Sequence, residues 1–426
     1  MRGPERKPIG SLGRRLTGSV NLGTVKWLAA VVVVVALTFG HLLGPFDLHT
    51  FLQAGAAVLR GHSPYPSVHS AVFRSGHAFV YPLFVAWLFA PLALLPRHPA
   101  EILYAIGSVL AIVVSSRLLG RRDFTAAALV LACSTTITGL QMGTVNAFLM
   151  LGLAASWHWR RSHPVLSGIA LGLTATAKLF LLPVLLWPFL RRRLTPAVSA
   201  FATVIVLIGA GGLFGTESPS HYLHLLSQLQ ANEVVSSWSL SSFFQGLSLS
   251  RTAASAVAVA LVAACLLVLW RRRSVVADGR LLGALVGCSL LMSPIVWSSY
   301  LLLLTVPLLL LTDDDLVLAA AAAASWLVVT PDAASWARVA IGAGTALILS
   351  YLVARSRFGE LRVLLSRRRW LLLVPIGVVT LVTAELLLPN QVRSPLPALV
   401  AMGVIVARCA GWRSADPRLA GPAPAS

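Results

Sequence analysis

Long apolar segments separated by short arginine clusters recur along almost the whole of this 426-residue chain. A helix needs roughly 20 mostly apolar residues to cross a bilayer. Only 11% of the residues are charged and 57% are hydrophobic, whereas a soluble domain carries about a quarter charged residues. Because helices satisfy their own backbone in lipid, the sequence predicts an all-α integral membrane protein with about 11–14 spanning segments.

The net charge of +20 raises the question of a nucleic-acid partner. The basic residues, however, fall in short clusters between the apolar segments, which is the positive-inside pattern of membrane proteins. This pattern predicts a multi-pass protein of the cell membrane with a cytoplasmic N-terminus, the lipid bilayer as its environment and no nucleic-acid partner. The clusters are Arg14–Arg15, Arg121–Arg122, Arg160–Arg161, Arg191–Arg193, Arg271–Arg273 and Arg367–Arg369.

The same pattern predicts the organisation of the chain. We expect a basic cytoplasmic tail over residues 1–25, one polytopic membrane domain over 26–411 and a disordered tail over 412–426. The first apolar segment ends without a small-residue cleavage site, so we expect an uncleaved anchor. Extracytoplasmic loops are expected at 46–79 and 216–250. Because these loops gather the polar residues and the inner loops are short, the sequence places the chemistry on the extracytoplasmic face.

Two parts of the chain do not divide into regular spans. Residues Tyr81–Pro96 and Ala100–Ser116 look like two helices, yet the charge pattern requires an odd number of crossings. Either one of them is re-entrant or the cluster Arg117–Arg122 lies outside. The apolar stretch that contains Lys178 lies between two basic clusters and is too short for two regular spans. We expect tilted or broken helices there, with an outer turn near Lys178.

Asp47 directly follows the first predicted span. A carboxylate at the membrane interface can act as a general base on a hydroxyl group, and partial burial would raise its pKa toward neutrality. The alternative is the N-cap of a helix over Leu48–Arg60, a role that Asp suits well. The two roles are compatible with each other.

Lys178 lies inside the apolar run Gly172–Pro183. A cation at the middle of a membrane helix costs about 2.5–3.5 kcal/mol, so such a residue usually faces a cavity or a partner such as a lipid phosphate. The alternative is a side chain that extends to the headgroup region and needs no ligand.

The second loop adds further candidates. Glu233 precedes the stretch Trp238–Phe244, which mixes aromatic rings with hydroxyl groups and suits either a sugar or lipid cleft or an interfacial helix. Arg251 opens the next helix, where a guanidinium can bind phosphate or anchor the helix at the membrane interface.

No metal site or soluble cofactor is predicted. The four cysteines lie far apart in apolar segments, and the histidines of the first loop lack ligand spacing. The sequence contains no phosphate-binding P-loop and no nucleophile motif of the G-x-S-x-G type, so nucleotide chemistry lacks support.

Four short stretches occur in a characteristic order between Phe46 and Leu311. They are Asp47 with Ala54–Gly61 and Tyr65; Tyr81-Pro82 with Ala90–Pro96; Gly143–Asn146 with Ser167-Gly168 through Lys178 to Pro183; and Ser293-Pro294-Ile295-Val296-Trp297. This ordered set resembles glycosyltransferase family 87, the polyprenol-phosphate-mannose-dependent α-mannosyltransferases of the GT-C fold. The resemblance implies a polytopic bundle with an extracytoplasmic cap of loops and interfacial helices.

The resemblance also implies an activity. The family moves a sugar, mannose, from a polyprenyl-phosphate donor to a cell-envelope glycolipid or polysaccharide, with inversion and without a soluble cofactor. Asp47 would be the catalytic base, and Lys178 and Arg251 would hold the donor phosphate as its charge grows. The supporting cleft would be formed by Tyr65, Tyr81, Asn146, Glu233, Trp238, Trp297 and Tyr300.

The chain departs from the family pattern at three places. Thr144 replaces a glutamine, Ser298–Tyr300 replaces a stretch that often has histidine, and Leu83 replaces a second proline. Two other functions stay open, a lipid-linked-sugar flippase or transporter and a non-catalytic family member. A transporter favours paired broken helices and ionisable residues at the midplane, whereas most charges here lie at the ends of the apolar segments.

Overall fold

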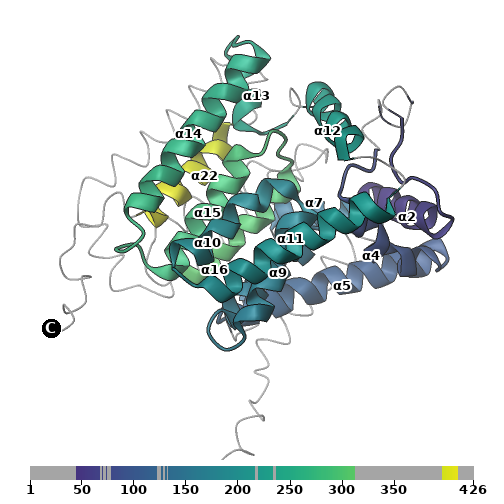
Figure 1. Ribbon diagram of the computed structural model, residues 1–426, viewed down its shortest axis with the longest axis horizontal. Helices are drawn as coiled ribbons and strands as arrows, with labels where there is room; N and C mark the ends of the chain where they lie inside the picture. The colour runs from purple at the N-terminus through teal and green to yellow at the C-terminus, as the bar shows by residue number, and fades with distance from the viewer. Residues whose placement is uncertain are drawn as a thin grey trace, which may run out of the picture.

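The computed structural model shows a bundle of helices (Figure 1), and no strand occurs in the residues that it describes. This confirms the predicted all-α class. The predicted first span, residues 312–395 of the predicted membrane domain and both predicted tails lie outside the described residues. The total of about 11–14 spans therefore stays a prediction. The structure describes residues 45–311 and 396–410, apart from 68–69, 71–72, 74–77, 122–125, 128–129, 132, 216–218 and 234–236.

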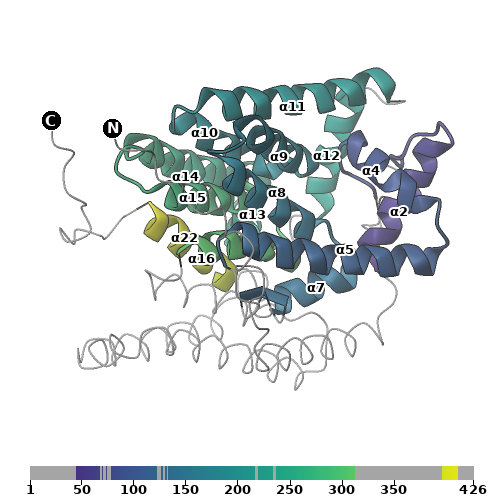
Figure 2. The same cartoon turned by 90° about the horizontal axis from the view of Figure 1, so that it is seen from below.

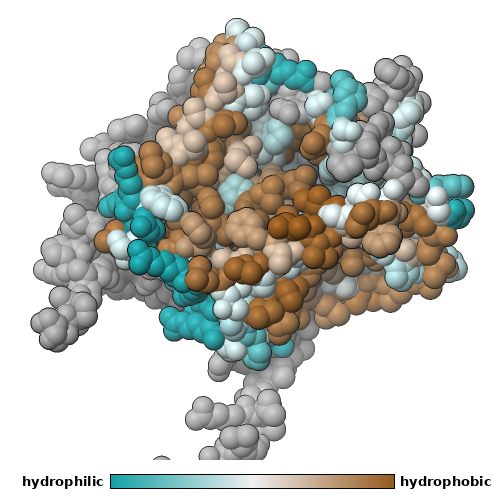
Figure 3. Space-filling view, viewed as in Figure 1, coloured by the Kyte–Doolittle hydropathy of each residue, from teal (hydrophilic) through white to brown (hydrophobic). Residues whose placement is uncertain are grey.

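Within these residues, three helices are long and apolar enough to cross a membrane. They are α5 (Arg97–Leu118), α11 (Leu194–Phe214) and α14 (Arg251–Arg271). Two further helices, α7 (Ser134–Met142) and α8 (Asn146–Trp159), pass the same test as a pair that is bent by 118°. Figure 3 shows a broad apolar face with hydrophilic residues at its margins, as expected of a surface that lipid covers.

Residues 81–116, for which the charge pattern requires an odd number of membrane crossings, form two helices, as predicted. α4 (Leu83–Ala93) has only 11 residues, fewer than the roughly 20 that a regular span needs. The full-length α5 follows it after a short turn. α4 packs against α2 (Phe46–Leu59), which agrees with the helix predicted over Leu48–Arg60.

The segment around Lys178 is a broken helix, as predicted. α9 (Pro164–Ala177) ends at Lys178, whose backbone is extended at φ −136° and ψ 105°. The chain continues as a 3₁₀ helix, η1 (Leu179–Leu185), and then as α10 (Leu186–Leu190). Pro183 lies inside η1, where its missing N–H and its ring disfavour a regular α-helix. The break places Lys178 at the end of α9 rather than on a helix face.

Helices α8 and α15 are among those that run between the opposite ends of the bundle. α8 runs from Asn146 to Trp159 and α15 runs from Asp278 to Met292, and each is about 20 Å long. We call the end with the Gly143 turn and Lys178 the cleft end. We call the other end, with the arginine-rich turns that precede α9, α11 and α15, the basic end.

Three helices outside the candidate spans gather at the cleft end (Figures 1 and 2). They are α2, α12 (Pro219–Glu233) and α13 (Leu240–Gly246). η3 (Ser298–Leu304) begins at the cleft end, and α16 (Thr305–Leu311) continues from it toward the basic end, where Leu310 lies close to Gly279. α22 (Leu396–Cys409) packs against α15.

Candidate functional site

Asp47 lies in the first turn of α2, and the N-cap position is occupied by Pro45 without a side-chain cap. The N-cap interpretation is therefore wrong, because the helix begins one residue before Asp47. Burial raises the pKa of the Asp47 carboxyl to about 6, although the charge of the nearby Lys178 lowers it. Such a carboxylate is a stronger base than an exposed aspartate and is still ionised near neutral pH.

The turn between α7 and α8 fixes the position of Asp47. Gly143 ends α7 with a left-handed backbone, φ 69°. A Cβ atom there would lie 2.6 Å from Leu48 Cβ and 2.9 Å from Pro45 Cβ. Only glycine combines this backbone with so close an approach, so the turn packs directly on the start of the helix that carries Asp47.

The same turn presents Asn146, which is fully buried at the start of α8. Its Nδ2 donates a hydrogen bond to Thr144 Oγ1 at 3.0 Å. The backbone carbonyl of Thr144 in turn accepts a hydrogen bond from the Tyr104 hydroxyl at 2.9 Å. These bonds hold the turn in place and leave the Asn146 carbonyl oxygen to face Lys178.

Lys178 points into the protein, and its side chain does not extend to the bundle surface. The residue is 6% exposed, and Nζ donates a hydrogen bond to Asn146 Oδ1 at 3.4 Å. Nζ also lies 3.3 Å from the centroid of the Tyr300 ring. Phe180 stacks against Tyr300, with its ring 5.2 Å from that of Tyr300 and 16° from parallel, and Nζ lies 5.8 Å from its centroid. An aromatic face attracts a cation, more strongly when water is excluded.

A cavity of about 490 Å³ opens beside Lys178. Tyr81 forms part of its wall, and burial raises the pKa of the Tyr81 phenol, with the charges of Tyr300 and Asp47 raising it further. The phenol is therefore neutral. The lining residues with polar or aromatic side chains are Tyr81, Lys178, Phe180, Tyr222, Ser227, Ser293 and Tyr300.

Hydrogen bonds to the backbone hold the walls of this cavity. The Tyr65 hydroxyl donates to the Tyr81 carbonyl at 3.0 Å, and the Tyr222 hydroxyl donates to the Val80 carbonyl at 3.1 Å. Tyr65 therefore supports the cavity from behind and is absent from its lining. Tyr222 connects α12 to the segment before α4.

A second, apolar groove of about 940 Å³ lies between α4, α5, α8 and α9. It borders the polar cavity at Ala177, the neighbour of Lys178. From there it extends along α5 to Leu118 and along α8 to Trp159, at the basic end. The groove therefore joins the cleft to the part of the bundle that lipid covers.

Three of the other predicted site residues, Arg251, Trp238 and Trp297, are absent from the lining of this cavity. Arg251 is exposed at the first position of α14. Glu233 is the last residue of α12. Trp297 is the residue before η3 and is not part of the lining. Trp238 donates its backbone N–H to the Val296 carbonyl at 2.8 Å and so joins the two segments.

Sequence reasoning missed Tyr104, Phe180 and Tyr222. Tyr104 is a hydroxyl-bearing residue inside an apolar span, a signal that could have marked it. The other two become partners of the site only through the packing of η1 and α12. No group of three or more metal-ligating side chains that could hold a metal occurs within the part of the chain that the structure describes.

Comparison with known proteins assigns the chain to a family. The model of glycosyltransferase family 87 matches residues 79–294, half of the chain. This match includes Tyr81, Asn146 and Lys178, whereas Asp47 precedes it and Tyr300 follows it.

A curated relative is the α-(1→3)-arabinofuranosyltransferase of Mycolicibacterium smegmatis (strain ATCC 700084 / mc(2)155), which is 33% identical over 141 residues. These residues are 30% of this chain and 33% of that protein, so the match spans about a third of the relative. No solved structure matches the chain. On the family match over half of its length, the chain belongs to glycosyltransferase family 87.

Proposed function

We propose that this protein transfers a sugar from a polyprenyl-phosphate donor to a hydroxyl group of a cell-envelope glycolipid or polysaccharide, on the extracytoplasmic face. The observation that carries the proposal is the presence of Asp47 and the buried Lys178 at one end of the bundle, beside an apolar groove. A base, a phosphate-binding cation and a lipid path are what such a reaction needs. Membership of the glycosyltransferase family supports the same reaction class.

In the donor, one phosphate carries a sugar and an isoprenoid chain. The polar cavity and the apolar groove together have room for these two substituents. The phosphate of the donor lies against Lys178 Nζ, and its sugar occupies the cavity of about 490 Å³. Its isoprenoid chain follows the apolar groove, which extends along α5 from Leu103 to Leu118, a distance of about 22 Å at 1.5 Å per residue. Moving an isoprenoid chain from lipid into such a groove costs little free energy, because both surroundings are apolar.

The reaction follows from these positions. Asp47 removes the proton from the acceptor hydroxyl, whose oxygen attacks the anomeric carbon from the face opposite the phosphate. The new C–O bond forms as the bond to the phosphate oxygen breaks, so the anomeric configuration inverts. The leaving polyprenyl phosphate gains a negative charge, which the Lys178 ammonium stabilises in a site that largely excludes water.

Two sugars are candidates. The resemblance in the sequence implies mannose. The match to an arabinofuranosyltransferase favours a pentofuranose as the second candidate. The walls of the cavity are mainly aromatic and apolar, which suits stacking on a sugar ring of either kind.

A transfer assay tests the proposed function. Membranes with the full chain are given radiolabelled polyprenyl-phosphate mannose or polyprenyl-phosphate arabinofuranose, together with envelope lipid extracts as acceptors. We expect label to appear in the acceptor fraction from one of the two donors. Movement of labelled donor across the bilayer without transfer to any acceptor would contradict the proposal in favour of a flippase.

The Gly143 turn provides a prediction about the placement of Asp47. Gly143→Ala should reduce transfer by about tenfold or more, because the added Cβ atom pushes α2 away. The matched control is Gly61→Ala, since Gly61 has a similar backbone, φ 72°, but no atom within 4 Å of an added Cβ. Both variants carry the same backbone strain. Equal losses of initial rate in the two variants would show that strain, and not the contact with α2, matters.

Tyr300 provides a prediction about Lys178. Tyr300→Leu removes the aromatic face that lies 3.3 Å from Lys178 Nζ. We expect the KM for the donor to rise about tenfold, because this is the size of effect expected when a cation–π contact is lost in a site that excludes water. Tyr300→Phe keeps the face and should stay close to the wild type. Steady-state kinetics with varied donor separate KM from kcat. Equal behaviour of the two variants would exclude this role for the ring.

A further inference from the structure

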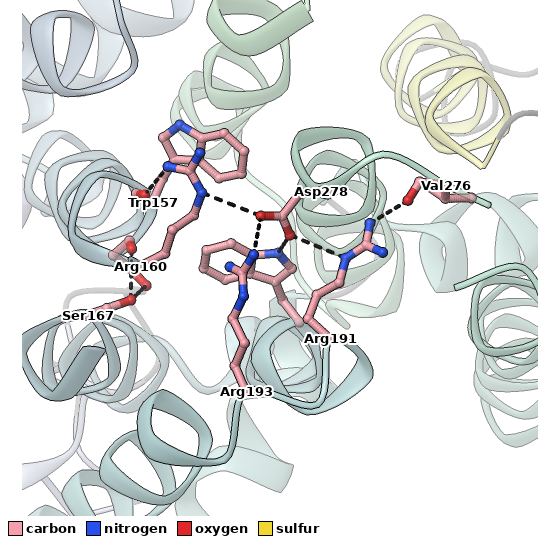
Figure 4. A network of polar contacts seen from close by, with 9 residues as sticks. Trp157, Arg160, Ser167, Arg191, Arg193, Val276 and Asp278 are labelled. Carbon is pink, nitrogen blue, oxygen red and sulfur yellow. Dashed lines mark hydrogen bonds and ion pairs between the residues drawn. The ribbon is translucent and has the colours of Figure 1, made fainter. Parts of the chain in front are cut away.

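The basic end of the bundle holds a cluster of three arginines around one carboxylate, distinct from the cleft end (Figure 4). Asp278 Oδ2 lies 2.9 Å from Arg193 Nη2 and 3.3 Å from Arg160 Nε. Asp278 Oδ1 accepts hydrogen bonds from Trp187 Nε1 at 2.9 Å and from Arg191 Nε at 3.2 Å. The cluster joins the ends of α8 and α10 to the start of α15.

The positive charges of this cluster exceed the negative charge. Burial would raise the pKa of Asp278, but the hydrogen bond from Trp187 and the charges of Arg193 and Arg191 bring it below its ordinary value, so the carboxylate is ionised. Burial lowers the pKa of Arg160; Asp278 offsets part of this, and the charges of Arg161 and Arg193 lower it further. One carboxylate therefore faces three guanidinium groups that also repel one another.

Arg191 uses its guanidinium fully within the protein. It donates to Asp278 and to the backbone carbonyls of Arg273 and Val276. Arg191 is thus a structural tie between α10 and the turn before α15.

Arg160 and Arg193 are different, because neither uses its whole guanidinium within the described residues. Arg193 contacts Asp278 through Nη2, and its Nη1 is buried and has no hydrogen-bond partner in that part of the chain. Arg160 donates from Nη1 to the Trp157 carbonyl and pairs through Nε with Asp278 Oδ2, and no contact in that part of the chain involves its Nη2. A guanidinium has five N–H donors, and leaving them unpaired in a partly buried place is costly.

The two guanidinium groups are also held in position. The Arg160 guanidinium carbon lies 3.5 Å from the centroid of the Trp157 ring, and that of Arg193 lies 6.0 Å from the Trp187 ring. The two indoles stack with centroids 5.8 Å apart. The side chains remain 20% and 26% exposed, respectively, so their outer edges are open to a ligand. Planar, positioned guanidinium groups bind phosphate oxygens bidentately.

From these contacts we propose that Arg160 and Arg193 form a phosphate-binding site at the basic end of the bundle. The phosphate is carried by the headgroup of an anionic membrane lipid or is free in solution. Large apolar side chains are exposed beside the cluster, Phe189 at 47%, Leu194 at 68% and Trp270 at 44%. They give acyl chains a surface next to the headgroup position. The site is independent of the proposed sugar transfer.

Lipid binding to the purified full chain tests this site. The probes are dioleoyl phosphatidylglycerol, dioleoyl phosphatidylcholine and inorganic phosphate, each compared with sodium chloride at equal ionic strength. We expect phosphatidylglycerol to raise the Tm and to appear as a retained lipid in native mass spectra. Arg160→Gln and Arg193→Gln should weaken this binding about tenfold each, the value of one charge-assisted contact. The matched control is Arg161→Gln, an exposed neighbour that should bind as the wild type does.

The results of these measurements either identify the source of the phosphate or overturn the proposal. Full stabilisation by inorganic phosphate, with no addition from phosphatidylglycerol, identifies free phosphate as the source. Equal stabilisation by phosphatidylcholine and phosphatidylglycerol overturns the proposal, as does undiminished binding in both glutamine variants. If Arg193→Gln does not fold, Arg160→Lys decides, because it keeps the charge but loses the planar contact with Trp157 and should bind less tightly than the wild type.

Discussion

Replacing Asp47 with asparagine should abolish sugar transfer and leave the fold and donor binding intact. Asparagine has nearly the same shape but cannot take a proton, and general-base catalysis contributes about 10²–10⁴-fold to a rate. Because Asp47 is in the first turn of α2 and caps no backbone group through its side chain, the substitution costs the helix little. Initial rates with labelled donor, at matched expression, measure the effect. Equal transfer by Asp47→Asn and the wild type would remove Asp47 from catalysis.

The pH profile of the wild type gives an independent check of Asp47. The base must be ionised, so kcat/KM should fall as the pH drops through the Asp47 pKa of about 6. An exposed aspartate would place this limb near pH 4 instead. Because Lys178 lowers the Asp47 pKa, removing its charge should move the residual acidic limb to higher pH. A limb near pH 4 in the wild type would contradict the burial of the base.

Much of the fold could be predicted because the bilayer restricts the possible structures. The spacing of apolar segments and arginine clusters predicted the two helices of residues 81–116 and the break at Lys178. The 3₁₀ geometry that follows the break has a local cause, the proline inside η1. The helix after Asp47 could also be predicted, although its first residue, Phe46, could not, because the chemistry of the cap decides it.

The sequence proposed the two charged residues of the candidate site and three residues that lie near Lys178, Tyr81, Asn146 and Tyr300, but it did not point to Tyr104, Phe180 or Tyr222. Asp47 and Lys178 stand out because burying a charge requires a reason. Their proximity depends on the contact of Gly143 with Leu48, which joins segments almost a hundred residues apart. Arg251, like Lys178, was expected to hold the donor phosphate, but it is exposed at the start of α14, whereas Lys178 is buried.

Because Lys178 is buried and Arg251 is exposed, we expect Lys178→Gln to lower the rate of transfer strongly. The variant loses the ammonium that faces the growing phosphate charge, and the loss of one such electrostatic contact costs about 10²–10³-fold in kcat. The matched control is Arg251→Gln, which removes an exposed cation outside the cavity lining and should leave the rate near that of the wild type. Steady-state kinetics with saturating donor measure both. Equal losses in the two variants would restore the two-cation phosphate site that the sequence suggested.

Stability separates a catalytic role of Lys178 from a structural one. Its ammonium is 6% exposed, and burial of a charge is costly even when an amide and an aromatic ring are near. Lys178→Gln should therefore unfold at the same temperature as the wild type or a higher one, while its rate falls. A residue that mainly supported the fold would lose Tm and rate together. If Lys178 is kept in the protein interior to bind a developing negative charge, its replacement should raise the stability and lower the turnover.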